Sequence, residues 1–299
     1  MPRSYAFVTV DVFTSVPFEG NPLAVVTDAR GLDTAEMQRI AREFNLSETT
    51  FILPPANPKH TAHVRIFTPY SELPFAGHPT LGTTFVLRGD SQATEFVLEE
   101  GAGPVPVRVA TAADGNARFW LTTPPIRFGE RIDRQPVAAA LGLKPDDLHA
   151  DVAPEVATAG PPFLFVPVKS RELVDRIELL DHRELRGALP NAPAGVYAFA
   201  LLDRTEDGTY AAYGRLFAPE QGIAEDPATG SAIGPLTALM MRRGMIPRED
   251  GLRVLVEQGT KLGRRSLLYA LAHVDGADDP RIEVGGSVVP IGRGELTLP

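Results

Sequence analysis

RIFTP at Arg65–Pro69 returns as RLFAP at Arg215–Pro219, about half of the 299-residue chain later. Each copy leads into a glycine-containing turn within a stretch that lacks Asp, Glu, Lys and Arg, Leu73–Leu87 in the first copy and Pro227–Met241 in the second. A unit repeated once at half the chain length predicts two similar domains, because a solenoid would show many short repeats. The place where two such domains meet is where we expect the chemistry.

The two uncharged stretches predict two helices. Pro79 suits the first turn of a helix and makes His78 the expected N-cap, and Ser231 occupies the matching place in the second copy. Arg88-Gly89 and Arg243-Gly244 are typical of a basic last turn closed by a glycine C-cap. Each helix is therefore expected to be about three turns long.

Apolar or small side chains lie on every side of both expected helices, and a helix of that kind must be buried all round. We therefore expect an α+β fold of two similar domains, each a barrel-like, strongly curved sheet around one central helix. Two core helices in an ordinary α+β domain are the alternative. The first domain is expected over residues 1–123, completed by a strand from 286–299, and the second over 124–285, with the active site in the interdomain cleft.

Outside these stretches most of the chain is typical of short strands. An exposed helix is expected over Thr34–Phe44, where apolar residues recur at helical spacing after Asp33, a suitable N-cap. Weaker helical patterns cover Gln135–Leu141, Ser170–Ile177 and Leu180–Leu189.

Composition excludes several classes of function. A formal net charge of −9 leaves no basic surplus for nucleic acid. The chain contains 0 cysteines, which excludes disulfides, thiolate zinc sites and a cysteine nucleophile. Asp11 interrupts the N-terminal apolar residues before they are numerous enough for a signal peptide. The uncharged stretches are too short to span a membrane. We expect a cytoplasmic protein. No dinucleotide, phosphate-loop or metal-ligand spacing is present, so neither a cofactor nor a metal is predicted.

The helix starts at Gly77-His78 and Gly230-Ser231 are the first candidate for a binding site. If both domains bury their helices alike, these starts can converge on the cleft, where free backbone N–H groups and the positive helix ends would hold a carboxylate. The alternative is that each glycine only allows a tight turn before the helix.

Three titratable residues are candidates for acid/base chemistry. His78 and Asp226 stand at the two helix starts, and Glu48 follows the Thr34–Phe44 helix. Each has an ordinary explanation: a histidine at a helix start is usually structural, an aspartate there usually caps the helix, and Glu48 can be a surface carboxylate. His78 and Asp226 facing each other across a cleft would form an acid/base pair.

Four motifs around these residues strongly resemble the signatures of the phenazine biosynthesis PhzF-like family. They are FEGNPLAVV (Phe18–Val26), NLSETTF (Asn45–Phe51), FAGHPTLG (Phe75–Gly82) and EDPATGSA (Glu225–Ala232). The resemblance runs through the whole catalytic core and implies a fold similar to diaminopimelate epimerase, which agrees with the fold inferred from the uncharged stretches.

The resemblance also implies roles. Glu48 would take a proton from a ring carbon and deliver it elsewhere on the same molecule, a task that suits a desolvated carboxylate with a raised pKa. His78 and Asp226 would relay protons and bind polar groups. The carboxylate would be received by Ser231 and the backbone amides of Gly77 and Gly230, with Asn21 and Thr229 as further substrate contacts. A homodimer is expected from the resemblance alone.

Epimerases and racemases of the wider superfamily use one cysteine at each helix start, but here Ala76 and Thr229 occupy those places. The leading hypothesis is therefore a cofactor-independent isomerase that moves a proton within a small cyclic or unsaturated carboxylic acid, similar to a dihydro-hydroxyanthranilate isomerase. The alternatives are an epimerase or racemase that uses non-thiol bases, and a catalytically idle binding protein on the same fold.

Overall fold

A computed structural model describes residues 2–112, 115–178, 193–219, 222–276 and 280–299 of the chain. The chain divides into two compact units. The first comprises Met1–Thr122 and Gly285–Pro299, and the second comprises Thr123–Val284.

The first unit is mainly sheet with two helices among its described residues. Its elements are β1 (Arg3–Val12), β2 (Asn21–Val26), α1 (Thr34–Phe44), β3 (Glu48–Leu53), β4 (Ala62–Phe67), β5 (Glu72–Leu73), α2 (Gly77–Arg88), β6 (Glu95–Glu100), β7 (Gly103–Thr111), β8 (Ala117–Thr122) and β18 (Val288–Leu298).

The second unit is also mainly sheet and has additional short helices among its described residues. Its described elements are β9 (Arg127–Arg131), α3 (Arg134–Ala140), the 3₁₀ helix η1 (Pro145–Asp147), β10 (Glu155–Thr158), β11 (Pro162–Pro167), α4 (Arg171–Asp175), β12 (Gly195–Leu202), β13 (Tyr210–Ala218), β14 (Ile223–Asp226), α6 (Gly230–Arg242), β15 (Arg253–Gln258), the 3₁₀ helix η3 (Thr260–Leu262), β16 (Ser266–His273) and β17 (Arg281–Gly286), which contains the boundary to the first unit.

Both units connect their strands in the same way. In the first, β18, β1 and β2 are antiparallel neighbours, β2 is parallel to β3, β3 and β5 are antiparallel to β4, and β4 is parallel to β6, which is antiparallel to β7. The second repeats that order through β9, β10, β11, β12, β13, β14, β15 and β16. Such a match of direction at every step confirms the predicted pair of similar domains.

The registers make the two sheets equivalent residue by residue. Three cross-strand pairs of the first unit recur in the second: Thr49↔Phe67 as Val196↔Phe217, Ile66↔Leu73 as Leu216↔Asp226, and Ala62↔Leu98 as Ala212↔Val256. Counting along the strands from these pairs shows which residues are equivalent in the two units: Glu48 corresponds to Gly195, Leu73 to Asp226, and Glu100 to Gln258.

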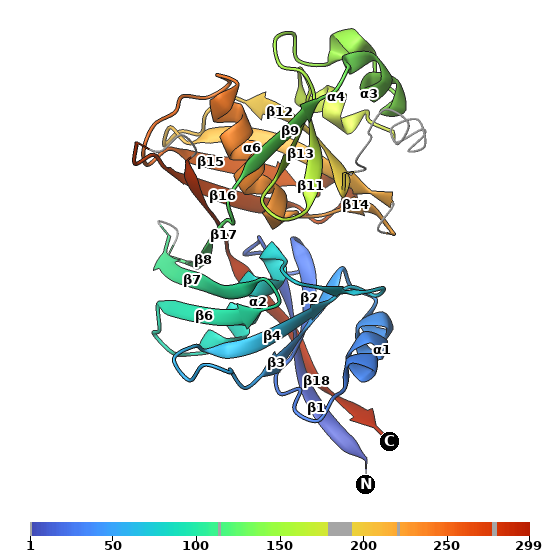
Figure 1. Cartoon of the computed structure of the whole chain (residues 1–299), viewed down its shortest axis with the longest axis vertical. Helices are drawn as coiled ribbons and strands as arrows, with labels where there is room; N and C mark the ends of the chain where they lie inside the picture. Colours follow the sequence, from blue (N-terminus) through green and yellow to red (C-terminus); the bar gives the residue numbers. More distant parts are fainter. Residues whose placement is uncertain (1, 113–114, 179–192, 220–221, 277–279) are drawn as a thin grey trace. The chain divides into compact units, whose positions relative to one another are not determined.

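Each unit wraps its sheet around one helix, α2 in the first and α6 in the second (Figure 1). Helix α2 packs against β1, β2, β3, β6, β8 and β18, while α6 packs against β10 and β16. The first two turns of α2 and nearly all of α6 are buried. Glycine permits this fit, because a Cβ on Gly82 would lie 2.6 Å from Leu23 and one on Gly234 would lie 2.5 Å from Thr123. The predicted fold class is confirmed, and the ordinary α+β alternative is wrong.

Helix α1 covers the outer face of the first sheet. Asp33 caps it through a capping box with Glu36, so the predicted helix and its N-cap are confirmed. Met37, Ile40 and Ala41 bury the apolar face of the helix in a cluster with Phe51 and Phe67.

Some predicted helix limits are wrong. The N-cap of α2 is Ala76, not His78, because Ala76 is the last residue with extended backbone angles and the helix begins at Gly77. Likewise Thr229, not Ser231, is the N-cap of α6, and Arg243 is its C-cap, with Gly244 following in the left-handed region. Helix α4 ends at Asp175, two residues before the predicted end. The helix predicted over Leu180–Leu189 lies outside the described residues.

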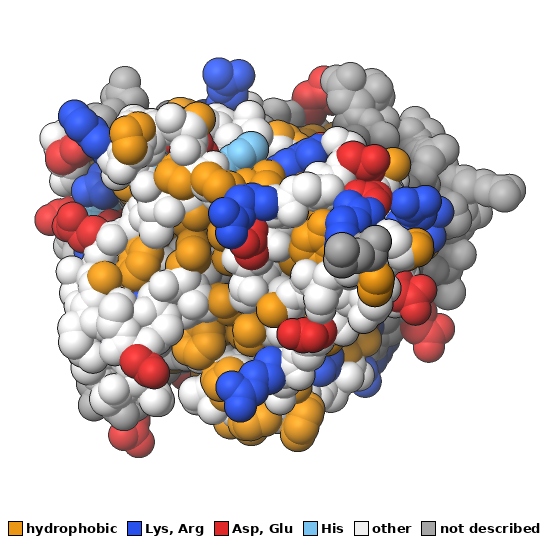
Figure 2. Space-filling model, turned by 90° about the horizontal axis from the view of Figure 1, so that it is seen from below, with side chains coloured by type: hydrophobic (Ala, Val, Ile, Leu, Met, Phe, Trp, Pro, Cys, Tyr) orange, Lys and Arg blue, Asp and Glu red, His pale blue; other side chains and the backbone are white. Residues whose placement is uncertain are grey.

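Lys and Arg side chains are interspersed with Asp, Glu and hydrophobic side chains on the face drawn in Figure 2, and the described residues there form no continuous basic stripe. None of the described helices is long and apolar enough to cross a membrane.

Candidate active site

The sheet of the first unit directs Glu48 toward α2. Strands β2 and β3 are parallel with Leu23 opposite Glu48, and residues opposite each other in adjacent strands face the same side of a sheet. Leu23 lies against Gly82 of α2. Thr50, two residues after Glu48, makes a 2.8 Å hydrogen bond with Thr83 of the same helix. The side chain of Glu48 therefore lies on the helix side of the sheet, together with Asn21, which is two residues before Leu23.

Glu48 and His78 are in contact at this place. Nε2 of His78 lies 3.2 Å from Oε2 of Glu48, and the two side chains are only 6% and 12% exposed. Burial lowers the pKa of His78 to about 3, because taking an imidazolium out of water is unfavourable. At neutral pH a buried carboxyl group thus faces an uncharged imidazole.

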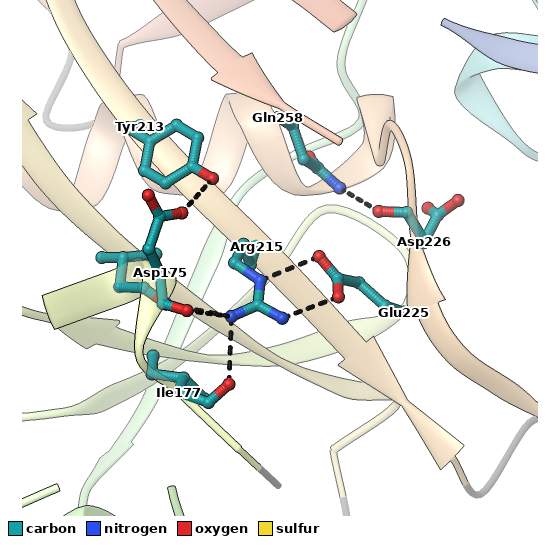
Figure 3. Close-up of polar contacts among 8 residues, drawn as sticks. Asp175, Ile177, Tyr213, Arg215, Glu225, Asp226 and Gln258 are labelled. Atoms are coloured by element: carbon teal, nitrogen blue, oxygen red, sulfur yellow. Dashed lines mark hydrogen bonds and ion pairs between the residues drawn. The ribbon is translucent and has the colours of Figure 1, made fainter. Parts of the chain in front are cut away.

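The start of α6 is held by a buried hydrogen-bond network in the second unit. The hydroxyl of Thr229 donates to Oδ2 of Asp226 at 2.5 Å. Nε2 of Gln258 donates to the backbone oxygen of Asp226 at 2.8 Å, as Figure 3 shows, and to the hydroxyl of Thr229 at 3.0 Å. Oε1 of Gln258 accepts from the hydroxyl of Tyr197 at 2.9 Å and from the amide of Thr229 at 3.3 Å. One amide side chain therefore fixes both Asp226 and the N-cap of α6.

Arg215 holds strand β14, which ends in Asp226, through hydrogen bonds. Its Nε and Nη2 atoms donate to the two carboxylate oxygens of Glu225 at 2.9 and 2.8 Å. Nη1 donates to backbone oxygens at the end of α4, those of Val174 and Ile177, both at 3.0 Å. Figure 3 shows the guanidinium between Glu225 on one side and Ile177 on the other. Arg215 belongs to the repeated RLFAP, and the first copy has the same two-pronged pair between Arg65 and Glu72.

The predicted binding residues divide between the two units. In the first, Gly77 is the first residue of α2, and Asn21 is fully buried at the start of β2. In the second, Gly230 is the buried first residue of α6, and Ser231, the counterpart of His78, is half-buried. The structure brings Glu48 together with His78, and Asp226 together with Thr229. One shared site in an interdomain cleft stays a prediction.

Sequence reasoning missed Tyr197, Gln258 and the Arg215–Glu225 pair. The pair had a signal, since aligning ELPFAGH (Glu72–His78) with EDPATGS (Glu225–Ser231) places a glutamate after each repeated arginine. No sequence signal indicated Tyr197 and Gln258, because they come from strands distant in sequence. The described residues contain no group of three or more His, Asp or Glu side chains that could hold a metal ion.

Comparison with known proteins identifies the family. The model of the family described as phenazine biosynthesis-like protein matches residues 10–294. The chain belongs to this family. One relative is an uncharacterized isomerase of Mesorhizobium japonicum, 40% identical over 98% of both chains. Another relative is the trans-2,3-dihydro-3-hydroxyanthranilate isomerase of Pseudomonas fluorescens, 38% identical over 98% of this chain and 99% of the relative.

A solved structure within the phenazine biosynthesis-like family shares the fold. It is the crystal structure of a phenazine biosynthesis protein of the PhzF family from Bacillus anthracis, with a TM-score of 0.90 and 25% identity, covering 98% of this chain and 99% of that chain. The predicted family and the predicted enzyme class are both confirmed: the protein is an isomerase that acts on a small molecule.

Proposed function

We propose that the protein moves a proton within a small cyclic or unsaturated carboxylic acid, in the manner of trans-2,3-dihydro-3-hydroxyanthranilate isomerase, with Glu48 as the base. The observation that carries the proposal is the contact between Glu48 and His78 at the start of a buried helix. A carboxylate shielded from water retains the proton that it removes, because no solvent is at hand to exchange it.

The proton transfer balances within one substrate molecule. The carboxylate of Glu48 takes a proton from a ring carbon, the electron pair of that C–H bond shifts into the conjugated system, and a double bond moves. The neutral carboxyl group then gives the same proton to another carbon, so that Glu48 returns to its starting state. No net oxidation occurs, and no group leaves.

The remaining residues are assigned to binding and positioning. His78 is uncharged, so its ring can donate one N–H to a polar group of the substrate and accept at the other nitrogen. Asp226, held by Gln258 and Thr229, is proposed to relay protons and bind an amino or hydroxyl group. The backbone amides of Gly77 and Gly230, with Ser231, are proposed to receive the carboxylate, because free N–H groups at helix starts favour anions. Asn21 and Thr229 complete the proposed contacts.

We also propose a cytoplasmic homodimer, which rests on the resemblance to the family and on the cysteine-free composition. Light scattering coupled to gel filtration measures the mass in solution directly. A monomer across the micromolar range would contradict the dimer.

The assay that tests the function follows trans-2,3-dihydro-3-hydroxyanthranilate by NMR in heavy water. We expect the double bonds of the ring to rearrange in the presence of the enzyme. Amino acids incubated in parallel serve as the contrast, since an epimerase with non-thiol bases would exchange the α-hydrogen for deuterium and leave double bonds in place. Exchange at an α-carbon, without rearrangement of any ring acid tested, would contradict the proposal.

A further inference from the structure

Glu100, the last residue of β6, has a buried carboxyl group that the proposed chemistry does not use. Its Oε1 lies 2.6 Å from the hydroxyl oxygen of Thr80 in α2, and that hydroxyl lies 2.7 Å from the backbone oxygen of Ala76, the N-cap of α2. Both contacts have the length of O–H···O hydrogen bonds, so each requires a proton between its oxygens.

Counting protons shows which groups supply them. The hydroxyl of Thr80 has one hydrogen, and the backbone oxygen of Ala76 has none and can only accept. The hydroxyl hydrogen therefore lies between Thr80 and Ala76. The proton between Thr80 and Glu100 then has to come from the carboxyl group of Glu100, which must be protonated.

The surroundings of Glu100 favour the neutral carboxyl. The residue is 6% exposed, and its Oε2 has no hydrogen-bond partner among the described residues. An ionised oxygen in that place would be far more costly than the carbonyl oxygen of a neutral acid. Burial raises the pKa of Glu100 to about 8, and the hydroxyl of Thr80 lowers it by a smaller amount.

The second unit carries an amide at the same position. The strand registers make Gln258 the equivalent of Glu100 in the second unit. Gln258 holds the start of α6 by donating from its Nε2 and accepting at its Oε1. The next residue is a tightly packed glycine in both units: a Cβ on Gly101 would lie 2.9 Å from Pro74, and one on Gly259 would lie 2.5 Å from Pro227. A protonated carboxyl group and a carboxamide share one shape, with one donor side and one acceptor side.

We infer that Glu100 is a protonated positioning residue, which holds the N-terminal turn of α2 through Thr80 as Gln258 holds that of α6. Loss of the Glu100 proton breaks the hydrogen-bonded chain Glu100–Thr80–Ala76. This chain holds the turn that carries Gly77 and His78, the groups proposed to bind the substrate and relay protons. The structural part of the inference is independent of the reaction, whereas its effect on turnover rests on the proposed function.

No nearby charge accounts for the neutral state. The elements that pack against β6 are α2, β4 and β7. The titratable and charged side chains on these elements and on β6 itself are His63, Arg65, His78, Arg88, Glu95, Glu99 and Arg108. None of them contributes to the pKa of Glu100, and His78 is uncharged near neutral pH. The proton is therefore retained because the carboxyl group is buried.

The test is the pH dependence of stability in Glu100→Gln, the residue that the second unit already uses. A pKa that is higher in the folded chain gives stability that is complete below the unfolded value of 4.5 and is lost as the pH rises to about 8. The melting temperature of the wild type should fall relative to that of Glu100→Gln by several degrees between pH 5 and pH 8, and the difference should then level off.

Glu95→Gln is the matched control. Glu95 is the first residue of the same strand and is exposed, so its carboxyl group lies in water in both the folded and the unfolded chain. Its curve should run parallel to that of the wild type from pH 5 to pH 8. Parallel curves for Glu100→Gln as well would overturn the inference.

A second measurement does not depend on the variant folding. Infrared spectra of the wild type should show a protonated-carboxyl C=O band at pH 7 that disappears above pH 8, and absence of that band at pH 7 would overturn the proposal. In the activity arm, Glu100→Gln should retain turnover and lack an alkaline limb near pH 8 that the wild type shows. If no ring acid is turned over, the proposed function fails, while the stability and infrared results still decide the state of Glu100.

Discussion

Glu48 and Gly195 occupy the same position in the two repeats, but only one of them can carry a base. Glu48 is the first residue of β3 and lies opposite Leu23, and Gly195 is the first residue of β12 and lies opposite Phe163. A Cβ on Gly195 would lie 2.9 Å from the backbone oxygen of Phe217, so a side chain there would displace backbone. The duplicated fold therefore places a carboxylate at this position in one unit and a glycine in the other, which suits the proposed return of the proton by the group that removed it.

Glu48→Gln should lower kcat on the identified substrate by about 10²- to 10⁴-fold, the usual contribution of a positioned general base. The amide keeps the shape of the side chain but has no basic oxygen, so substrate binding should change little. Glu43→Gln is the control, because Glu43 is an exposed residue of α1. Full turnover by Glu48→Gln would show that another group is the base.

His78 should make the protein sensitive to acid. Its pKa is about 3 when folded and 6.5 when unfolded, so the stability that burial of the neutral ring allows is present above pH 6.5 and is lost as the pH falls toward 3. Urea unfolding should show the wild type losing about 2–3 kcal/mol relative to His78→Gln between pH 7.5 and 4.5. A ring signal of His78 that titrates between pH 5 and 8 by NMR would refute this.

Gln258→Leu should cost about 3–5 kcal/mol, because the buried hydroxyl of Tyr197 and the backbone at Asp226 and Thr229 each lose a hydrogen bond. Tyr197→Phe is the milder comparison at about 1 kcal/mol, since the amide of Thr229 still donates to Gln258. Chemical unfolding at pH 7 gives both values. The explanation fails if Tyr197→Phe proves the more damaging of the two.

The repeated Arg–Glu pair provides its own control. Arg215→Met should destabilise by about 3–5 kcal/mol, because it leaves Glu225 with a buried charge. Arg65→Met should cost at most about 1 kcal/mol, since Glu72 is 40% exposed and water replaces the lost partner. Equal losses measured by urea unfolding would show that burial is not what separates the two pairs. Arg215→Met should also reduce turnover, because Glu225 precedes Asp226 in β14.

Local sequence signals predicted the elements that depend on local physics. The two uncharged stretches predicted buried helices because no side of either helix could face water, and Asp33 predicted the start of α1 because its side chain caps Glu36. The precise first residue of α2 escaped prediction. Gly77 and His78 could have been turn or helix, and the backbone just before them is held where Pro74 contacts Gly101 and Ala102, which are distant in sequence.

The sequence by itself determined the duplication, the two buried helices, the absence of thiols and the four motifs of the family, because each is written in neighbouring residues or in composition. Tertiary structure alone decided that Glu48 contacts His78, that Gly195 takes the matching place in the other repeat, and that Glu100 stands where Gln258 does. These relationships follow from strand register and helix packing. Both join residues far apart in the chain through contacts that no local pattern records.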